Sequence, residues 1–166
     1  MSYADENAWI VAIIPVVGVE LYSCTFLSEK PRTLISKDGY YLMFQSEDKY
    51  KEVLSNEGYN LNEYVFGENI YVFDIPRVTY LLSMEEYDPS AEIVELLNYL
   101  DDCRLDLNID YPANFKKHLF DFCDHLTFEK EYGEFFKNNT NITRQNILDA
   151  YYWCLGSVMS RTKIVI

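Results

Sequence analysis

The chain has 166 residues, of which 49% are hydrophobic and 16% aromatic, with fifteen tyrosines among them. A chain of this length buries about two thirds of its unfolded surface in one domain, so the composition excludes a disordered tail. The formal net charge of −13 disfavours nucleic acid and anionic membranes as partners, because both require Lys and Arg to neutralise phosphate. It favours a basic protein as partner.

The N-terminal third is expected to be mainly β-strand. Trp9–Ile14 and Val17–Leu27 are rich in β-branched and aromatic residues, and Pro15 separates them. Asp5 and Glu6 replace the basic residues that open a signal peptide, so this apolar run is interpreted as buried strand. No segment reaches the roughly 18–20 apolar residues that span a bilayer. We therefore expect a cytoplasmic protein.

Two glycine-containing turns predict β-hairpins. The predicted hairpins join Thr33–Ser36 to Tyr40–Phe44 through Lys37-Asp38-Gly39, and Tyr64–Phe66 to Ile70–Ile75 through Gly67-Glu68-Asn69. Between them, Ser46 is expected to cap a short helix that continues to Asn56, and Gly58 ends it. Arg77–Met84 fits either a strand or a helix.

From residue 88 onward the apolar residues recur with the period of an α-helix. The predicted helices cover Pro89–Leu107 after an Asp88 cap, Pro112–Leu126, a short segment capped by Thr127 that carries Phe128, Tyr132, Phe135 and Phe136, and a last helix capped by Thr143. Thr162–Ile166 fits a final strand or a loose tail. The sequence thus predicts a single α+β domain, residues 1–166. Residues 1–84 form an antiparallel sheet built from hairpins, and residues 88–160 form helices that cover it.

The helix that begins after Asp88 carries most of the negative charge. Residues 85–110 hold nine acids and one base, a net −8, whereas residues 1–84 contribute −6 and residues 111–166 contribute +1. At 100° per residue one side of this helix is apolar: Ile93, Leu96, Leu97, Leu100, Cys103 and Leu107. The opposite side is acidic, with Glu95, Asp102 and Asp106 at its centre and Glu92 and Tyr99 flanking them.

An acidic outer side is the ordinary arrangement of an amphipathic helix, and a solvated face is the simplest interpretation. Two details favour a binding surface. Asp102 and Asp106 stand four residues apart, which destabilises the helix by a few tenths of a kcal/mol. Tyr99 adds a residue type that interfaces favour.

On the last helix Trp153 points away from the apolar side formed by Ile147, Leu148, Tyr151, Tyr152, Leu155 and Met159. Trp153 is therefore either covered by another element or an exposed anchor for a partner.

The sequence contains no motif for a known enzyme class and none that assigns a family. Its six glycines are isolated, so no phosphate-binding loop is present, and its four cysteines show no paired spacing, as expected for reduced thiols. His118, Asp121 and His125 lie along one edge of a predicted helix, which makes them weak candidates for a metal or a general base. We expect no cofactor.

These observations favour an acidic inhibitor of another protein. The predicted function is that of a bacterial antitoxin or immunity-type protein that occludes the active site of a basic toxin, such as a nuclease. A phage-type nuclease inhibitor or DNA mimic is one alternative, and a metal-dependent enzyme that uses His118, Asp121 and His125 is another. From Glu92 to Asp106 the helix spans about 21 Å, over which duplex DNA carries about 12 charges. Five acids and one arginine over that length are too sparse for a mimic.

Overall fold

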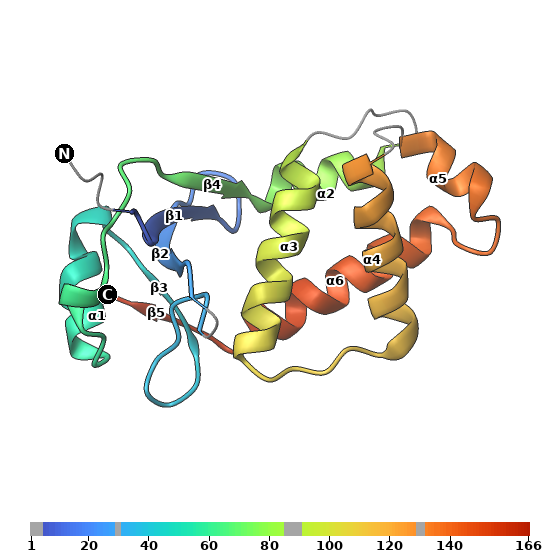
Figure 1. Cartoon of the computed structure of the whole chain (residues 1–166). Helices are drawn as coiled ribbons and strands as arrows, with labels where there is room; N and C mark the ends of the chain where they lie inside the picture. The colour runs from blue at the N-terminus through green and yellow to red at the C-terminus, as the bar shows by residue number, and fades with distance from the viewer. Residues whose placement is uncertain (1–4, 29–30, 85–90, 129–131) are drawn as a thin grey trace. The chain divides into compact units, whose positions relative to one another are not determined.

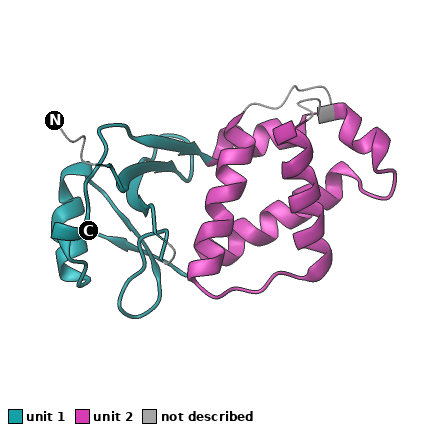
Figure 2. Cartoon of the chain, viewed as in Figure 1, with its two compact units in different colours: residues 1–74, 161–166 teal, residues 75–160 magenta. Residues whose placement is uncertain are grey.

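The computed structural model describes residues 5–28, 31–84, 91–128 and 132–166 (Figure 1). The strands come from the first half of the chain and its last residues, and most helices come from the second half, so the predicted α+β class is confirmed. The chain divides into two compact units, shown in Figure 2: unit 1 is residues 1–74 and 161–166, and unit 2 is residues 75–160. The single domain expected from the sequence stays a prediction.

Unit 1 is built on a five-stranded sheet with the order β4-β1-β2-β3-β5. The strands are β1 (Ala8–Ile14), β2 (Leu21–Phe26), β3 (Tyr41–Phe44), β4 (Tyr71–Asp74) and β5 (Thr162–Val165). The central three strands are antiparallel, as predicted, but β4 runs parallel to β1 and β5 runs parallel to β3. The wholly antiparallel sheet expected from the sequence is therefore wrong. Both edge strands follow long connections, which parallel pairing requires.

The turn at Lys37-Asp38-Gly39 forms as predicted. The N–H of Ser36 donates to the carbonyl of Tyr40 at 2.7 Å, and Gly39 takes a φ of +84°, a left-handed conformation that glycine adopts without strain. The short helix after Ser46 also forms, as η1 (Glu47–Lys49) followed by α1 (Tyr50–Asn56). A further single turn, η2 (Leu61–Glu63), precedes the segment that returns to the sheet.

The second predicted hairpin, at Gly67-Glu68-Asn69, is wrong. Phe66 forms a parallel bridge with Ala8, and Tyr71 is aligned with Val11, so both segments pair with the same edge of β1. The Gly67 N–H donates to the Ala8 carbonyl at 2.8 Å, which holds the connecting residues against β1. A glycine-containing turn therefore forms a bulge along one edge here instead of reversing the chain.

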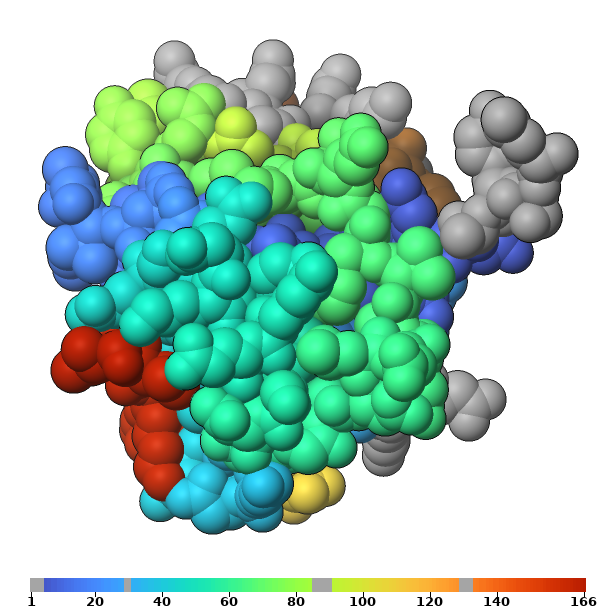
Figure 3. Space-filling view, turned by 90° about the vertical axis from the view of Figure 1, so that its left-hand side faces the viewer, coloured from blue at the N-terminus to red at the C-terminus, as the bar shows by residue number. Residues whose placement is uncertain are grey.

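The hydrophobic core of unit 1 lies between the sheet and α1. Figure 3 looks onto this side of the unit, with the cyan segment that contains α1 at the centre and the C-terminal residues in red beside it. The buried residues of this core come from three strands, the segment before β3 and α1: Ala8, Cys24, Phe26, Leu34, Leu42, Phe44, Val53 and Leu54. Each large apolar side chain in it contributes about 1.5–3 kcal/mol relative to exposure. Tyr59 closes one end, since its hydroxyl donates to the Ile35 carbonyl at 3.0 Å.

Gly67 is the glycine most tightly enclosed by its neighbours. A Cβ placed there would lie 2.2 Å from the indole nitrogen of Trp9. We expect Gly67→Ala to destabilise unit 1 by about 1–3 kcal/mol, the usual cost of overpacking. Urea unfolding followed by the fluorescence of Trp9, in a Trp153→Phe background, measures this change. Gly156→Ala, in unit 2 and followed through Trp153 in a Trp9→Phe background, is the matched control, because a Cβ on that helical glycine meets nothing within 4 Å and should stabilise by about 0.5–1 kcal/mol.

An exposed ion pair connects β5 to the turn before β3. Nζ of Lys163 donates to a carboxylate oxygen of Asp38 and lies 3.9 Å from the ring centroid of Tyr40. The hydrogen bond from Lys163, with a second from Ser36, lowers the pKa of Asp38, and the same bond raises the pKa of Lys163.

These pKa shifts predict the pH range over which β5 is held. Because the pKa of Asp38 is lowered on folding, the ion pair stabilises the folded state above the ordinary carboxyl pKa, near 4, and this stabilisation is lost as the pH falls through the folded-state pKa. Because the pKa of Lys163 is raised on folding, the ion pair also stabilises the folded state below about pH 10.5, and this stabilisation is lost at higher pH. The protection of the Thr162–Val165 amides, taken relative to their intrinsic exchange rate at each pH, should therefore fall toward acid pH. In Asp38→Asn this protection should be lower throughout and lack the acid step, and an unchanged profile would contradict the assignment.

The described residues of unit 2 form five helices: α2 (Ile75–Ser83), α3 (Ala91–Asp106), α4 (Ala113–Phe128), α5 (Tyr132–Asn138) and α6 (Arg144–Met159). The ambiguous segment Arg77–Met84 is thus mostly helical. Thr127 does not cap a new helix as predicted, because it lies inside α4 and its hydroxyl donates to the Cys123 carbonyl at 2.7 Å. Thr143 does cap α6, and Asn146 completes a reciprocal capping box.

Helix α6 lies at the centre of unit 2 and contacts α2, α3 and α4. Its buried residues are Ile147, Ala150, Tyr151, Cys154 and Val158. The predicted apolar side was partly wrong, because Tyr152 is 49% exposed whereas the small residues Ala150 and Cys154 are buried. Close packing on several sides favours small side chains over large ones. No helix in the described part of the chain is both long and apolar enough to cross a membrane.

Candidate functional site

The apolar side of α3 is buried as predicted, and this fixes which side of the helix faces outward. All six expected residues have 5% exposure or less: Ile93, Leu96, Leu97, Leu100, Cys103 and Leu107. The predicted cap at Asp88 and Pro89 lies outside the described residues. Because the helix can bury only one side, its rotation places the acidic side away from the core of unit 2.

The predicted carboxylates differ in their surroundings. Glu95 is exposed, whereas Asp102 and Asp106 are half-buried. Oε2 of Glu92 accepts a hydrogen bond from Nε of Arg77 at 2.6 Å, and both side chains are about half exposed. An exposed pair of this kind contributes at most about 1 kcal/mol. Glu92 therefore already has a basic neighbour within its own unit, whereas Glu95 is exposed and no side chain of the described residues forms an ion pair with it.

Tyr99 is not an exposed contact residue. The sequence placed it beside the acids on the outer side of α3, but its side chain is only 7% exposed. The buried side of α3 is therefore wider than the helical period alone indicates. Its expected place in a partner-binding surface is therefore corrected, and the tyrosine belongs to the core.

Arg104 is the base within the acidic stretch, and it too is buried. Its Nε donates to Oδ1 of Asp101 at 3.0 Å, and its terminal nitrogen donates to the Ile109 carbonyl at 2.8 Å. The guanidinium carbon lies 4.2 Å from the centroid of the Tyr111 ring, a cation–π contact. Arg104 thus joins the end of α3 to the loop before α4, and the charge it neutralises is that of Asp101.

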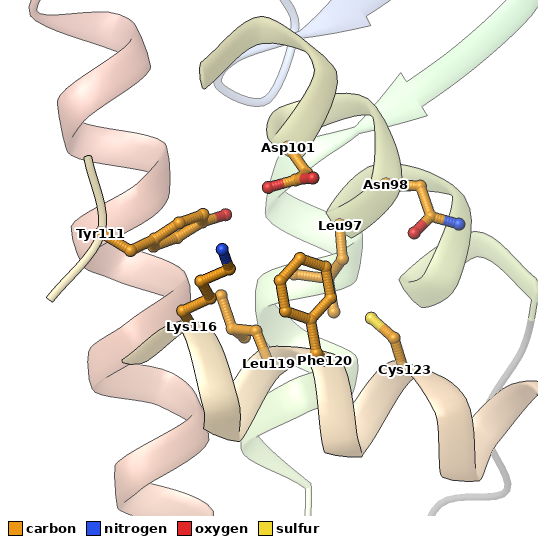
Figure 4. A pocket seen from close by; sticks show the side chains of 8 residues that line it. All are labelled: Leu97, Asn98, Asp101, Tyr111, Lys116, Leu119, Phe120 and Cys123. Carbon is orange, nitrogen blue, oxygen red and sulfur yellow. The ribbon is translucent and has the colours of Figure 1, made fainter. Parts of the chain in front are cut away.

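A small pocket opens between α3 and α4 beside this cluster (Figure 4). In Figure 4 the side chains of Asp101, Tyr111 and Lys116 turn toward one another, and Phe120 stands beside them. The lining residues are Leu97, Asn98, Asp101, Tyr111, Lys116, Leu119, Phe120 and Cys123. Its volume of about 20 Å³ is that of a single water molecule, so it is not a substrate pocket.

Trp153 belongs to an aromatic cluster and is half-buried. Its ring centroid lies 5.1 Å from that of Tyr111 and 6.2 Å from that of Phe115. The Tyr111 hydroxyl in turn lies 3.2 Å from Sγ of Cys154, and burial raises the pKa of Tyr111. Of the two interpretations of Trp153, the structure favours coverage by other elements of unit 2, with only part of the indole accessible.

The described residues show no group of three or more His, Cys, Asp or Glu side chains arranged to hold a metal. Asp121 accepts a hydrogen bond from Nζ of Lys117 at 2.5 Å, and the ring of His125 packs edge-on against Phe135 at 5.4 Å. Nδ1 of His118 is buried without a hydrogen-bond partner. The three candidates therefore do not converge on one point.

The four cysteines are free and buried, as the scattered spacing predicted. Burial raises the pKa of Cys24 and of Cys123 to about 12, and it also raises the pKa of Cys154. These three thiols are therefore protonated at neutral pH and are poor nucleophiles.

The sequence did not indicate an open hollow on unit 1. It has a volume of about 480 Å³, and its lining residues are Tyr22, Gln45, Ser46, Glu47, Asp48 and Tyr50. The hydroxyl of Tyr22 donates to Oε1 of Glu20, and this hydrogen bond raises the pKa of Tyr22. Five of the six residues lie in the run from Gln45 to Tyr50, which follows β3 and forms η1 and the start of α1, and Tyr22 of β2 joins them from a distant part of the sequence.

Comparison of the chain with protein-family models, curated proteins and solved structures found no match.

Substitution of Arg104 tests how much its contacts with Asp101 and Ile109 stabilise unit 2. Arg104→Leu removes the partner of Asp101 and leaves the Ile109 carbonyl without its donor, so we expect unit 2 to lose about 2–4 kcal/mol of stability. Urea unfolding followed by Trp153 fluorescence, in a Trp9→Phe background, measures the loss. Asp101→Asn keeps an oxygen acceptor for Arg104 and should cost less. Equal losses in the two variants would show that the ion pair, and not the contact with the loop, is what stabilises the helix end.

Proposed function

We propose that this chain is an acidic inhibitor of antitoxin or immunity type, which neutralises a basic protein such as a nuclease toxin by occluding its active site. The observation that carries the proposal is the net −8 of residues 85–110, much of it on α3, with Glu95 on the outward side of the helix. Within the described residues no side chain forms a hydrogen bond or ion pair with Glu95.

In this mechanism Glu95, Asp102 and Asp106 pair with the Lys and Arg side chains that otherwise hold substrate phosphate. Carboxylates suit that role because charge-assisted hydrogen bonds to Arg or Lys are about twice as strong as neutral ones. The net charge of −13 steers a basic partner toward the chain and makes association fast and sensitive to salt. Tyr99 has no part in this contact because it is buried, and the accessible part of Trp153 stays a candidate for an additional contact.

The partner is sought first among proteins encoded beside this chain, in particular one with a basic C-terminal domain. Its purified basic domain is titrated by calorimetry with the wild-type chain and with a Glu95→Lys, Asp102→Lys variant. We expect the variant to keep its circular dichroism spectrum and to bind more weakly by roughly 1 kcal/mol or more. Affinity of the wild type should fall steeply as salt rises.

A matched control separates a local contact from the effect of net charge. Asp124→Lys with Asp149→Lys makes the same change in charge at two exposed positions on other helices of unit 2, α4 and α6. This control should bind within about twofold of the wild type at physiological salt, where distant surface charges are largely screened. If both variants lose affinity equally, the proposed contact through α3 is wrong. If the α3 variant binds as tightly as the wild type, its acidic side is only solvated.

A further inference from the structure

Strand β4 is an edge of the sheet of unit 1 whose apolar side chains remain exposed. Ile70 is 39% exposed, Tyr71 48% and Val72 57%. Successive residues of a strand point to opposite faces, so the exposure of both Tyr71 and Val72 means that neither face is covered at this edge. Three consecutive large apolar residues on an exposed edge are unusual, because such an edge invites pairing with another chain.

The backbone of this segment is paired on one side. Within the described residues β4 pairs with β1 alone, and no hydrogen bond joins Ile70, Tyr71 or Val72 to any other element. The opposite edge of the sheet differs, because β5 carries Lys163, which is engaged with Asp38 and Tyr40. A lysine is a usual protection of an edge strand, and β4 has none.

The charge around β4 indicates what kind of strand fits there. The segment that contains β4, residues 61–76, has three acids, Glu63, Glu68 and Asp74, and no Lys or Arg. Glu63 and Glu68 are exposed on the segment that leads into β4. A second copy of this chain would bring the same acids against each other, and like charges at close range are repulsive. Charge complementarity therefore favours a basic segment.

We infer that the free edge of β4 accepts an extended segment of the partner protein, with alternating basic and apolar side chains, as an added strand. Main-chain hydrogen bonds to the Ile70–Val72 edge supply affinity, and the flanking carboxylates select basic side chains. Tyr71 packs edge-on against Trp9, with ring centroids 6.4 Å apart, and offers an aromatic surface to an apolar residue of that segment. The inference rests on the proposed function only in taking the partner to be basic.

A synthetic peptide, acetyl-(Lys-Val)4-amide, tests this without the partner itself. We expect it to slow hydrogen exchange at amides of Ile70–Val72 by about tenfold or more at saturation, as addition of a strand does. The same peptide N-methylated at every residue keeps its charge but has no backbone N–H to donate to β4, and it should give no protection. Acetyl-(Glu-Val)4-amide should not bind. Protection by the N-methylated peptide, or none by the parent peptide, would overturn the inference.

Two variants locate the contact on the chain. Val72→Lys places a positive charge on the edge and should weaken peptide binding about tenfold, whereas Val17→Lys, at an 86% exposed residue of a turn, should change it less than about twofold. Ile70→Lys is the second edge variant if Val72→Lys alters the Trp9 emission. Equal effects of the edge and turn variants would refute a site at β4.

A third measurement separates this inference from the proposed function. The Glu95→Lys, Asp102→Lys variant should bind the peptide as the wild type does, because the peptide contacts unit 1. Loss of peptide binding in that variant alone would assign the peptide to α3, which leaves the proposed function standing and removes the edge site. Sedimentation of the wild type without peptide should show a monomer, and a dimer abolished by Val72→Lys would make a second copy the occupant and overturn the inference.

Discussion

Burial of one side of α3 is the constraint on which the rest of unit 2 depends. Six apolar residues of this helix face the core, and this leaves only one rotation of the helix that avoids burying carboxylates. An unpaired buried carboxylate costs several kcal/mol, so the acids of the stretch either face solvent or pair with a base. Asp101 shows the second outcome, because it turns toward the core side and is paired with the buried Arg104.

Some acids of the chain are offset by a base of their own unit. Among the described residues these ion pairs include Arg77–Glu92, Arg104–Asp101, Lys117–Asp121 and Lys163–Asp38. All but the pair made by Arg104 are substantially exposed, where a pair contributes little and is screened by salt. The negative potential that these pairs leave is a cost in self-repulsion. A basic partner would turn that cost into binding energy, which is the physical basis of the proposed inhibitor.

The two proposed contacts use different interactions. At α3 the contact is between side chains, so it depends on charge, weakens with salt and tolerates small changes of orientation. At β4 the contact is made mainly by the backbone, so it depends on an extended partner segment and is insensitive to most side-chain changes that keep the edge open. One surface lies in each unit, and each can be tested with the other intact.

The sequence by itself determined the elements whose signals are local. The stripe of α3, the cap at Thr143, the turn at Gly39 and the α+β class were all predicted correctly, because helical period, caps and positive-φ glycines act within a few residues. The outward position of Glu95 follows from the same period. These features require no knowledge of what packs against them.

Only the tertiary structure decided the features that depend on distant neighbours. The burial of Tyr99, the parallel pairing of β4 and β5, and the bulge at Gly67 each depend on neighbours from other parts of the chain. The buried side of α6 likewise follows from the three helices that contact it. The exposed edge at Ile70–Val72 could not be predicted for the same reason. A run of β-forming residues has the same composition in a central strand and in an edge strand. Only the order of the strands shows that β4 lies at an edge.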